Sequence, residues 1–286
     1  MKPNRLLLIY ISLLTSFHGV CARNLDEPDI VRPVTSSYVF NIGKAELADT
    51  YLSPIIYRGW NTGFSYSRMQ AMGFSPEKWV MNLEIGADIA RGHNFTGNSL
   101  LWQTMINARW AMTHRWHLPY SITLAAGGYT GLNGGALYLR RNGNNPVAGK
   151  AAWNVGLRCY ATYPFRVGKI KMLARWQGTM PVAGIFFSPN YGELYYEIWL
   201  GNHEGLVHGS WWGNYFQLDN EITLDIFCRT NWLRIGYRSN VLSTKVNYIT
   251  TRIISNEFII GLSGEWISLR SEQSMNPNTR VISAIY

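Results

Sequence analysis

The chain has 286 residues, of which 47% are hydrophobic and 14% aromatic, and its formal net charge is +9 at pH 7. The lysine and arginine residues are spread along the sequence rather than clustered, which argues against nucleic-acid binding. No segment approaches about 18 unbroken apolar residues, so no transmembrane helix is expected. Beyond the N-terminal segment only Cys159 and Cys228 remain, too few for a structural zinc site.

The N-terminal segment has the three parts of a signal peptide. Lys2 and Arg5 supply the positive charge, residues 6–17 form an apolar stretch, and small residues follow at the expected cleavage site. We therefore expect a signal peptide over 1–22. Lipidation of Cys21 is the alternative, but the three residues before it fit a lipoprotein cleavage box poorly.

After a flexible periplasmic lead over 23–35, the sequence changes to long segments with a period of two. In the clearest segment, 77–91, every odd position from Trp79 to Ile89 is apolar, and Glu84 and Asp88 are among the polar residues between them. This alternation indicates a β-strand with one apolar and one polar face. Long strands rich in aromatic residues behind a secretion signal are typical of an outer-membrane barrel, whose apolar face contacts lipid.

The pattern predicts a closed antiparallel transmembrane β-barrel of about 12 strands over 36–270, with a C-terminal tail over 271–286. The expected strands lie near 36–46, 56–71, 77–91, 98–113, 117–130, 150–164, 168–181, 191–202, 204–213, 215–228, 231–243 and 255–269. Short periplasmic turns should alternate with longer outside loops, which are expected at 47–54, 131–149, 182–190 and 244–254. A count of ten strands would make one hairpin point the wrong way. A soluble secreted β-sandwich is the alternative fold.

The inward positions of these strands are rich in charge. The predicted lumen network consists of Glu84, Asp88, Arg109, Arg158, Arg175, Glu197, Glu221, Asp225, Arg234 and Arg238, with further inward charges at Lys171, Asp219, Glu257 and Glu265. Buried charge is tolerated only when it is paired, so we expect salt bridges that plug the lumen. A path for a substrate or an ion through the network is the alternative.

One segment, 206–214, has residue types suited to ester hydrolysis. His208 and Ser210 are two positions apart, hence on one face of a strand, and Asn220 on the next strand shares the lipid-facing positions. Ser210 would be the nucleophile, His208 the base and Asn220 the group that orients the ring. Alternatively, His208 and Ser210 belong to an aromatic girdle beside Trp211 and Trp212.

This arrangement resembles outer-membrane phospholipase A, a twelve-stranded barrel with an outward-facing His-x-Ser and an asparagine on the neighbouring strand. The likeness covers about fifteen residues. In that family Asn-Gly follows the serine, whereas Trp211 and Trp212 follow Ser210 here, so the calcium-binding and oxyanion roles do not carry over. The resemblance implies a lipid esterase. Under that hypothesis calcium would be the cofactor, with no residue of this chain assigned as its ligand.

A second resemblance covers most of the mature chain. It rests on residues 35–38, 49–54, 211–225 and 231–236, which look like a domain-of-unknown-function family, number 3316, of bacterial envelope proteins. It implies a secreted envelope protein and brings no assigned activity.

The leading interpretation is an outer-membrane barrel of unassigned role, structural or surface-binding, with a charged and plugged lumen. The alternatives are the lipid esterase and a small selective channel. Expected partners are outer-membrane lipids, lipopolysaccharide, whose phosphates Arg140 and Arg141 could bind, and the barrel-insertion machinery, but no nucleic acid. No metal site is predicted, and no cofactor apart from calcium under the esterase hypothesis.

Overall fold

The computed structural model describes residues 30–228, 231–267 and 279–285. The predicted signal peptide over 1–22 lies outside these residues, as do parts of the predicted lead and tail. The chain divides into two compact units, of which the larger comprises Arg32–Ser268 and Val281–Tyr286. Separately from the large sheet, β1 (Ile30–Val31) pairs with β13 (Arg280–Val281) in a two-stranded sheet.

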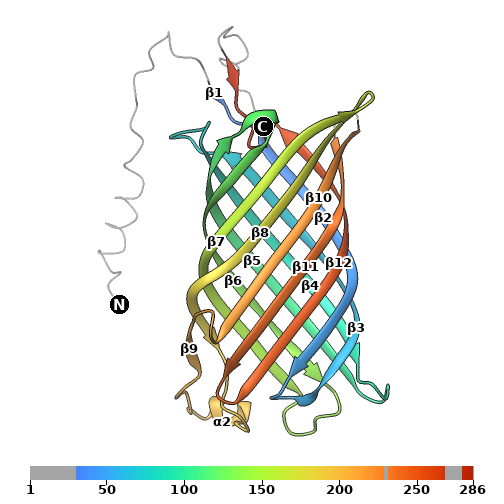
Figure 1. Ribbon diagram of the computed structural model, residues 1–286. Helices are drawn as coiled ribbons and strands as arrows, with labels where there is room; N and C mark the ends of the chain where they lie inside the picture. The colour runs from blue at the N-terminus through green and yellow to red at the C-terminus, as the bar shows by residue number, and fades with distance from the viewer. Residues whose placement is uncertain (1–29, 229–230, 268–278, 286) are drawn as a thin grey trace, which may run out of the picture. The chain divides into compact units, whose positions relative to one another are not determined.

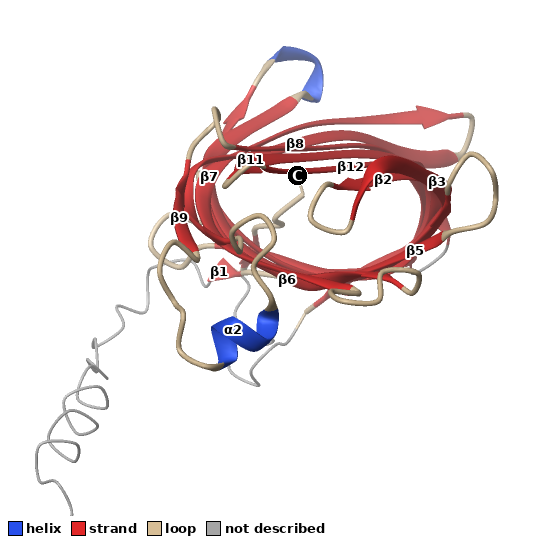
Figure 2. Ribbon diagram, turned by 90° about the horizontal axis from the view of Figure 1, so that it is seen from below, coloured by secondary structure: helices blue, strands red, loops and turns tan. Residues whose placement is uncertain are grey.

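The large unit is a closed barrel of antiparallel strands (Figures 1 and 2). Its ten strands are β2 (Val34–Asp49), β3 (Ser53–Ala71), β4 (Trp79–His93), β5 (Leu100–His117), β6 (Thr123–Leu139), β7 (Val147–Val167), β8 (Ile170–Phe187), β10 (Tyr215–Cys228), β11 (Asn231–Val246) and β12 (Ile249–Trp266). Neighbours in sequence pair with each other, β8 pairs with β10, and β12 returns to β2. This closure satisfies the backbone groups that an open sheet would leave without partners in hydrocarbon.

The predicted closed antiparallel barrel is confirmed, although its strand count is ten in the described residues instead of about 12. Two expected strands are not part of the barrel wall. The segment 191–202 contains the short helix α2 (Tyr195–Trp199), and within 204–213 only β9 (Val207–Ser210) is extended, paired with the end of β8. Three glycines with positive φ interrupt the extended chain there: Gly192, Gly201 and Gly205.

Residues 188–214 form one long connection between β8 and β10. With this single connection the ten barrel strands alternate in direction, so no hairpin points the wrong way. The barrel therefore has a loop end, with connections 50–52, 94–99, 140–146, 188–214 and 247–248, and a terminal end, with 72–78, 118–122 and 168–169. The loops predicted at 131–149 and 244–254 are shorter than expected. β6 and β7 extend into the first, and Asn247 and Tyr248, both with positive φ, close the second as a tight turn.

The outer wall of the barrel carries an apolar belt. Every barrel strand contributes at least one large apolar side chain that is more than a third exposed, for example Phe40, Phe64, Ile85, Ile106, Leu132, Leu157, Trp176, Ile222, Ile235 and Phe258. A belt of this extent is unusual on soluble monomers but is expected where lipid covers the wall. In the described ranges no helix has the length and hydrophobicity needed to cross a membrane.

The belt allows a test of membrane insertion, because the cost of a charged substitution on a lipid-facing wall depends on its depth in the bilayer. Leu132 lies in the middle of β6 and is 59% exposed, whereas Leu124 faces outward near the end of the same strand. Leu132→Arg should cost about 2–4 kcal/mol of stability in lipid, and Leu124→Arg about 0–1 kcal/mol. Urea unfolding in liposomes measures both values. Equal costs would contradict a lipid-facing belt.

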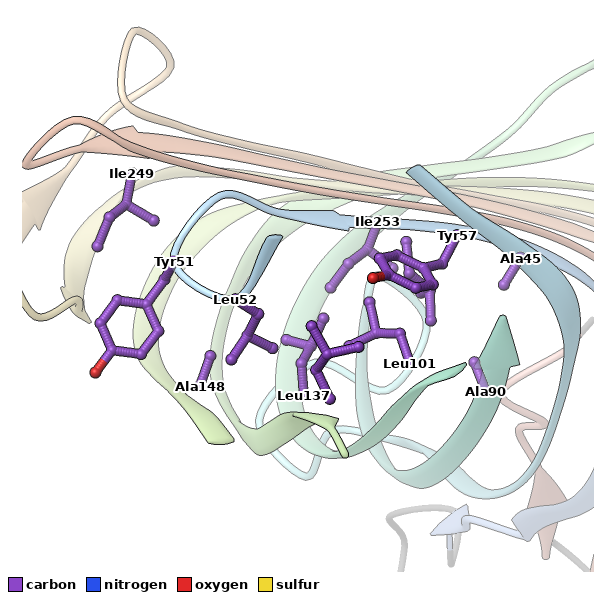
Figure 3. Packing of buried hydrophobic residues seen from close by; sticks show 12 residues of the cluster. Ala45, Tyr51, Leu52, Tyr57, Ala90, Leu101, Leu137, Ala148, Ile249 and Ile253 are labelled. Carbon is purple, nitrogen blue, oxygen red and sulfur yellow. The ribbon is translucent and has the colours of Figure 1, made fainter. Parts of the chain in front are cut away.

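Apolar side chains fill the lumen at the loop end (Figure 3). This loop-end cluster comprises Ala45, Leu47, Tyr51, Leu52, Tyr57, Ala90, Leu101, Leu137, Leu139, Ala148, Ile249 and Ile253. The 50–52 turn folds inward, and the Tyr51 hydroxyl donates a hydrogen bond to the Glu193 carbonyl at 2.6 Å. Burial raises the pKa of Tyr51, which keeps the phenol neutral as a donor.

A second, smaller apolar cluster lies at the terminal end. It contains Met69, Val80, Ala125, Tyr160 and Ala284. The chain around Ala284 is held by Arg115, whose Nη1 donates to the carbonyl of Ser283 at 2.8 Å. Residues 283–284 therefore pack inside the barrel, and the polar part of the lumen lies between two apolar clusters.

Candidate functional site in the barrel lumen

Two ion pairs join neighbouring strands β10 and β11 on the lumen side. Arg234 binds Asp225 through two hydrogen bonds, Nε to Oδ1 and Nη2 to Oδ2, both 2.7 Å. Arg238 Nη2 lies 2.8 Å from Glu221 Oε2. In each pair the two residues are direct register partners, so the strand pairing itself places the charges side by side.

A second set of ion pairs crosses the lumen. Glu84 on β4 accepts a hydrogen bond from Arg158 on β7 at 2.9 Å and lies 3.8 Å from Arg109 on β5. Arg109 in turn forms an ion pair with Asp219 on β10. The contacts Glu84–Arg158 and Arg109–Asp219 tie together strands that do not pair with each other, whereas Glu84 and Arg109 are register partners on neighbouring strands.

Arg175 lies near this network without a carboxylate within ion-pair distance among the described residues. Its Nη2 donates to Gln177 Oε1 at 3.0 Å, and its guanidinium stacks 5.0 Å from the centre of the Tyr160 ring. The cation–π contact and the amide oxygen thus replace a direct ion pair.

One predicted member of the network, Glu197, is not in the lumen. It lies on α2, where its Oε2 accepts a hydrogen bond from the backbone N–H of Leu194 at 2.9 Å and caps the helix. The prediction assumed a strand over 191–202, which would have pointed this carboxylate inward. Two further inward predictions lie at the terminal end, where Lys171 is exposed and Glu265 accepts from Ser283 and Thr35.

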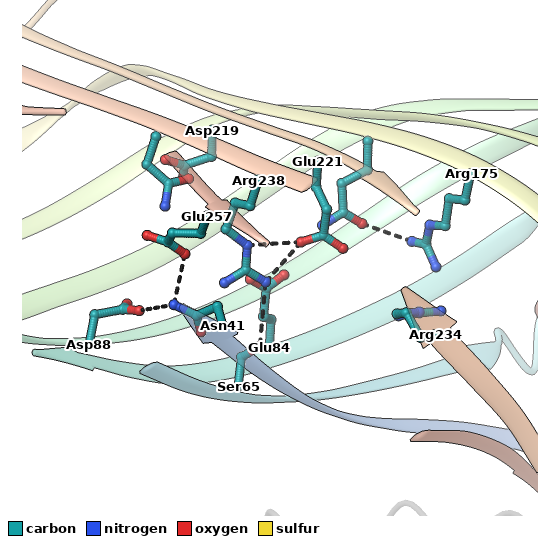
Figure 4. A network of polar contacts seen from close by, with 12 residues as sticks. Asn41, Ser65, Glu84, Asp88, Arg175, Asp219, Glu221, Arg234, Arg238 and Glu257 are labelled. Carbon is teal, nitrogen blue, oxygen red and sulfur yellow. Dashed lines mark hydrogen bonds and ion pairs between the residues drawn. The ribbon is translucent and has the colours of Figure 1, made fainter. Parts of the chain in front are cut away.

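Asn41 connects two carboxylates in the middle of the lumen (Figure 4). Its Nδ2 donates to Asp88 Oδ1 at 3.0 Å and to Glu257 Oε2 at 2.7 Å. Asn61 donates to the other oxygen of Glu257. Gly63 makes room for this arrangement, since a Cβ there would lie 2.1 Å from Asp88 Oδ1. The sequence analysis did not single out either asparagine, because the alternation marks a residue as inward-facing but does not show which inward polar residues bind a carboxylate.

Small cavities remain among these polar residues. One has a volume of about 100 Å³ and is bordered by the charged residues Asp88, Arg109, Asp219 and Glu257 and by the amides Asn61 and Gln103; because carboxylates outnumber the guanidinium, we call it the acidic chamber. A second, of about 40 Å³, lies among the ion pairs. Each is large enough for a few water molecules or an ion, and neither holds a solute of nutrient size.

Sequence reasoning also missed an ion pair near the loop end. Lys150 Nζ lies 2.6 Å from Asp49 Oδ2, and Thr251 Oγ1 donates to the same carboxylate oxygen at 2.8 Å. Asp49 had been expected in an outside loop, and Lys150 at the first position of a strand. Because β2 runs further than predicted, both residues lie on strands, and their charges neutralise each other inside the wall.

The structure does not bring the predicted catalytic residues together. Ser210 Oγ donates to Asn154 Oδ1 at 2.9 Å in the lumen. His208 Nε2 lies 3.3 Å from the Ser188 carbonyl and 3.2 Å from Asn247 Nδ2. Asn220 shares the outward face of β10 with Ile222, between the inward residues Asp219 and Glu221. In the structure β9 pairs with β8, so that Asn220 faces Gly178 and Ser239 instead.

None of the curated proteins compared with the chain is similar to it at a significant level. Among solved structures, the transport unit of the autotransporter AIDA-I from Escherichia coli shares 8% identity at a TM-score of 0.43, covering 91% of this chain and 97% of that one. The outer membrane protease OmpT from Escherichia coli shares 7% at 0.39, covering 85% and 100%. The translocator domain of the autotransporter NalP from Neisseria meningitidis shares 7% at 0.39, covering 92% and 98%. The family described as protein of unknown function DUF3316 matches residues 6–273, and the chain belongs to this family.

Proposed function

We propose that the protein is an outer-membrane barrel with a closed lumen, and that its role is carried by its outside surface. The observation behind this proposal is the filling of the lumen at three levels. The loop-end cluster closes one mouth, the ion pairs of Glu84, Asp219 and Glu221 occupy the middle, and residues 282–285 pack into the other mouth. A solute could pass only if all three levels moved.

The longest connection, 188–214, supplies the outside surface of this proposal. It is held in place by hydrogen bonds, because Asn247 Nδ2 donates to the carbonyls of Pro189 at 3.3 Å and Gly205 at 3.1 Å. Aromatic and large apolar side chains of the connection are more than half exposed: Tyr191, Tyr196, Trp199, Leu200, Trp211 and Trp212. Rigidly held aromatic side chains give contact area at a low entropy cost, which favours binding of a partner.

The proposed membrane environment of the barrel follows from the apolar belt and from two arginines in a connection at the loop end. The belt would contact outer-membrane lipids, and insertion would need the barrel-insertion machinery. Arg140 and Arg141 lie in the 140–146 connection and would reach lipopolysaccharide phosphates. The esterase hypothesis loses its basis, since Ser210 and Asn220 occupy opposite faces of the wall.

Conductance across a planar bilayer tests the closed lumen. The refolded protein, shown to be inserted by its heat-modifiable gel migration, should give no steady conductance steps and no swelling of liposomes in small sugars. The physical reason is that apolar clusters fill both ends of the lumen, and most of the charges between them are held in ion pairs instead of facing water. Reproducible steps of one size, scaling with protein and absent from a mock preparation, would show a channel and contradict the proposal.

A further inference from the structure

Asp88 and Glu257 differ from the other carboxylates in the middle of the lumen. Glu84, Asp219, Glu221 and Asp225 each have an arginine within ion-pair distance. Asp88 and Glu257 have no such partner among the described residues, although they share the same amide donor, Asn41. Two carboxylates held near one amide repel each other, and burial without a neutralising charge is costly.

The neighbouring guanidiniums are already in use. Arg109 is paired with Asp219 and Glu84, and Arg238 with Glu221. The second contact of Arg238 Nη2 is the hydroxyl of Ser65 at 3.4 Å. Asp88 and Glu257 therefore receive hydrogen bonds from neutral groups, and the nearby Arg109 and Arg238 attract them without forming an ion pair with either carboxylate.

The acidic chamber beside this pair is bordered by two amides whose oxygen atoms lack donors. Gln103 borders the chamber, is only 7% exposed, and its Oε1 has no hydrogen-bond partner. Asn61 also borders the chamber, and its Oδ1 is buried and without a partner because its Nδ2 is directed to Glu257. Turning the amide over would place its oxygen against the carboxylate, so this orientation is fixed by the charges.

We propose that the acidic chamber binds one hard divalent cation of the calcium type, ligated by Asp88, Glu257 and the amide oxygens of Asn61 and Gln103. Calcium takes several oxygen ligands from carboxylates, amide carbonyls and water in flexible geometry. Two carboxylates neutralise its charge, and the volume of about 100 Å³ has room for the ion with water. The described residues contain no cluster of three His, Cys, Asp or Glu side chains, so the amides are necessary ligands.

Calcium itself is the probe for this site. The purified barrel is stripped with a chelator and titrated with calcium chloride, and choline chloride at equal ionic strength serves as the salt control. The temperature of the heat-modifiable gel shift should rise by about 5 °C at a calcium concentration about 100 times the dissociation constant. Equilibrium dialysis with radioactive calcium should give one ion per chain.

Asp88→Asn and Glu257→Gln should each abolish the bound calcium and the thermal shift. Each preserves the shape of the side chain and its contact with Asn41, and each removes a charge that has no ion-pair partner among the described residues. Both variants should therefore fold and, without metal, be at least as stable as the metal-free wild type. Glu46→Gln is the matched control, because Glu46 is an exposed carboxylate paired with Arg58 at 2.8 Å, and it should bind calcium like the wild type.

Three results would overturn the proposal. The first is an equal thermal shift with choline chloride. The second is calcium binding that survives in both variants. The third is a metal-free wild type that is more stable than both variants and does not respond to calcium, which would mean that Asp88 and Glu257 share a proton instead of a metal ion.

Discussion

Replacing Arg234 by methionine should destabilise the barrel by about 3–5 kcal/mol, since the buried carboxylate of Asp225 then loses its ion-pair partner. The side chains of Arg234 and Asp225 are 5% and 2% exposed, and their contact is bidentate. Methionine fills a similar volume without supplying charge or donors. Urea unfolding in liposomes, followed by tryptophan fluorescence, gives the free energy of unfolding of each variant.

Two comparisons separate the charge effect from other losses. The double variant Asp225→Leu, Arg234→Met removes both charges and should recover most of the stability, because a buried ion pair adds little over apolar side chains of similar size. Arg58→Met breaks an exposed pair with Glu46 and should cost about 0–1 kcal/mol. If Arg234→Met were as mild as Arg58→Met, water would have to reach Asp225.

Leu137→Ala should cost about 2–5 kcal/mol through the cavity that it leaves in the loop-end cluster. Leu137 is fully buried, and its neighbours in the cluster come from strands on several sides of the lumen, so they cannot all move in to refill the space. The same unfolding experiment measures the loss.

Leu132→Ala is the matched control on the same strand. Leu132 faces outward and is 59% exposed, so lipid chains can fill the space left by the truncated side chain. Its cost should be clearly smaller than that of Leu137→Ala. Equal costs would mean that the lumen side of β6 is packed no more tightly than the lipid side, contrary to the structure.

The barrel wall could be predicted from the sequence because the wall has a simple period. The alternation over 77–91 identifies both the strand β4 and its inward residues Glu84 and Asp88. Ion pairs between register partners, such as Asp225 with Arg234, also lie within reach of such reasoning, since one short hairpin fixes the pairing.

Contacts across the lumen could not be predicted in this way. The pair of Arg109 and Asp219 depends on how the sheet curves and closes, which no local pattern encodes. The segment 191–213 was predicted as strands for a different reason. Its aromatic residues alternate as they would in a strand, but glycines with positive φ interrupt the extended chain. The error in strand pairing then placed Asn220 beside the wrong neighbour.

The seam between β2 and β12 has a consequence for how the chain folds. Asn41 and Glu257, which meet there, are 216 positions apart in sequence. Such contacts form only after the long intervening chain has been brought together, which makes folding slow. Until then, the edges of β2 and β12 have no pairing partner. Those edges are open to pairing with other chains until the seam forms. A substitution of Asn41 that weakens its contact with Glu257 should therefore slow barrel closure. It should also increase aggregation during refolding, even where the folded barrel is stable.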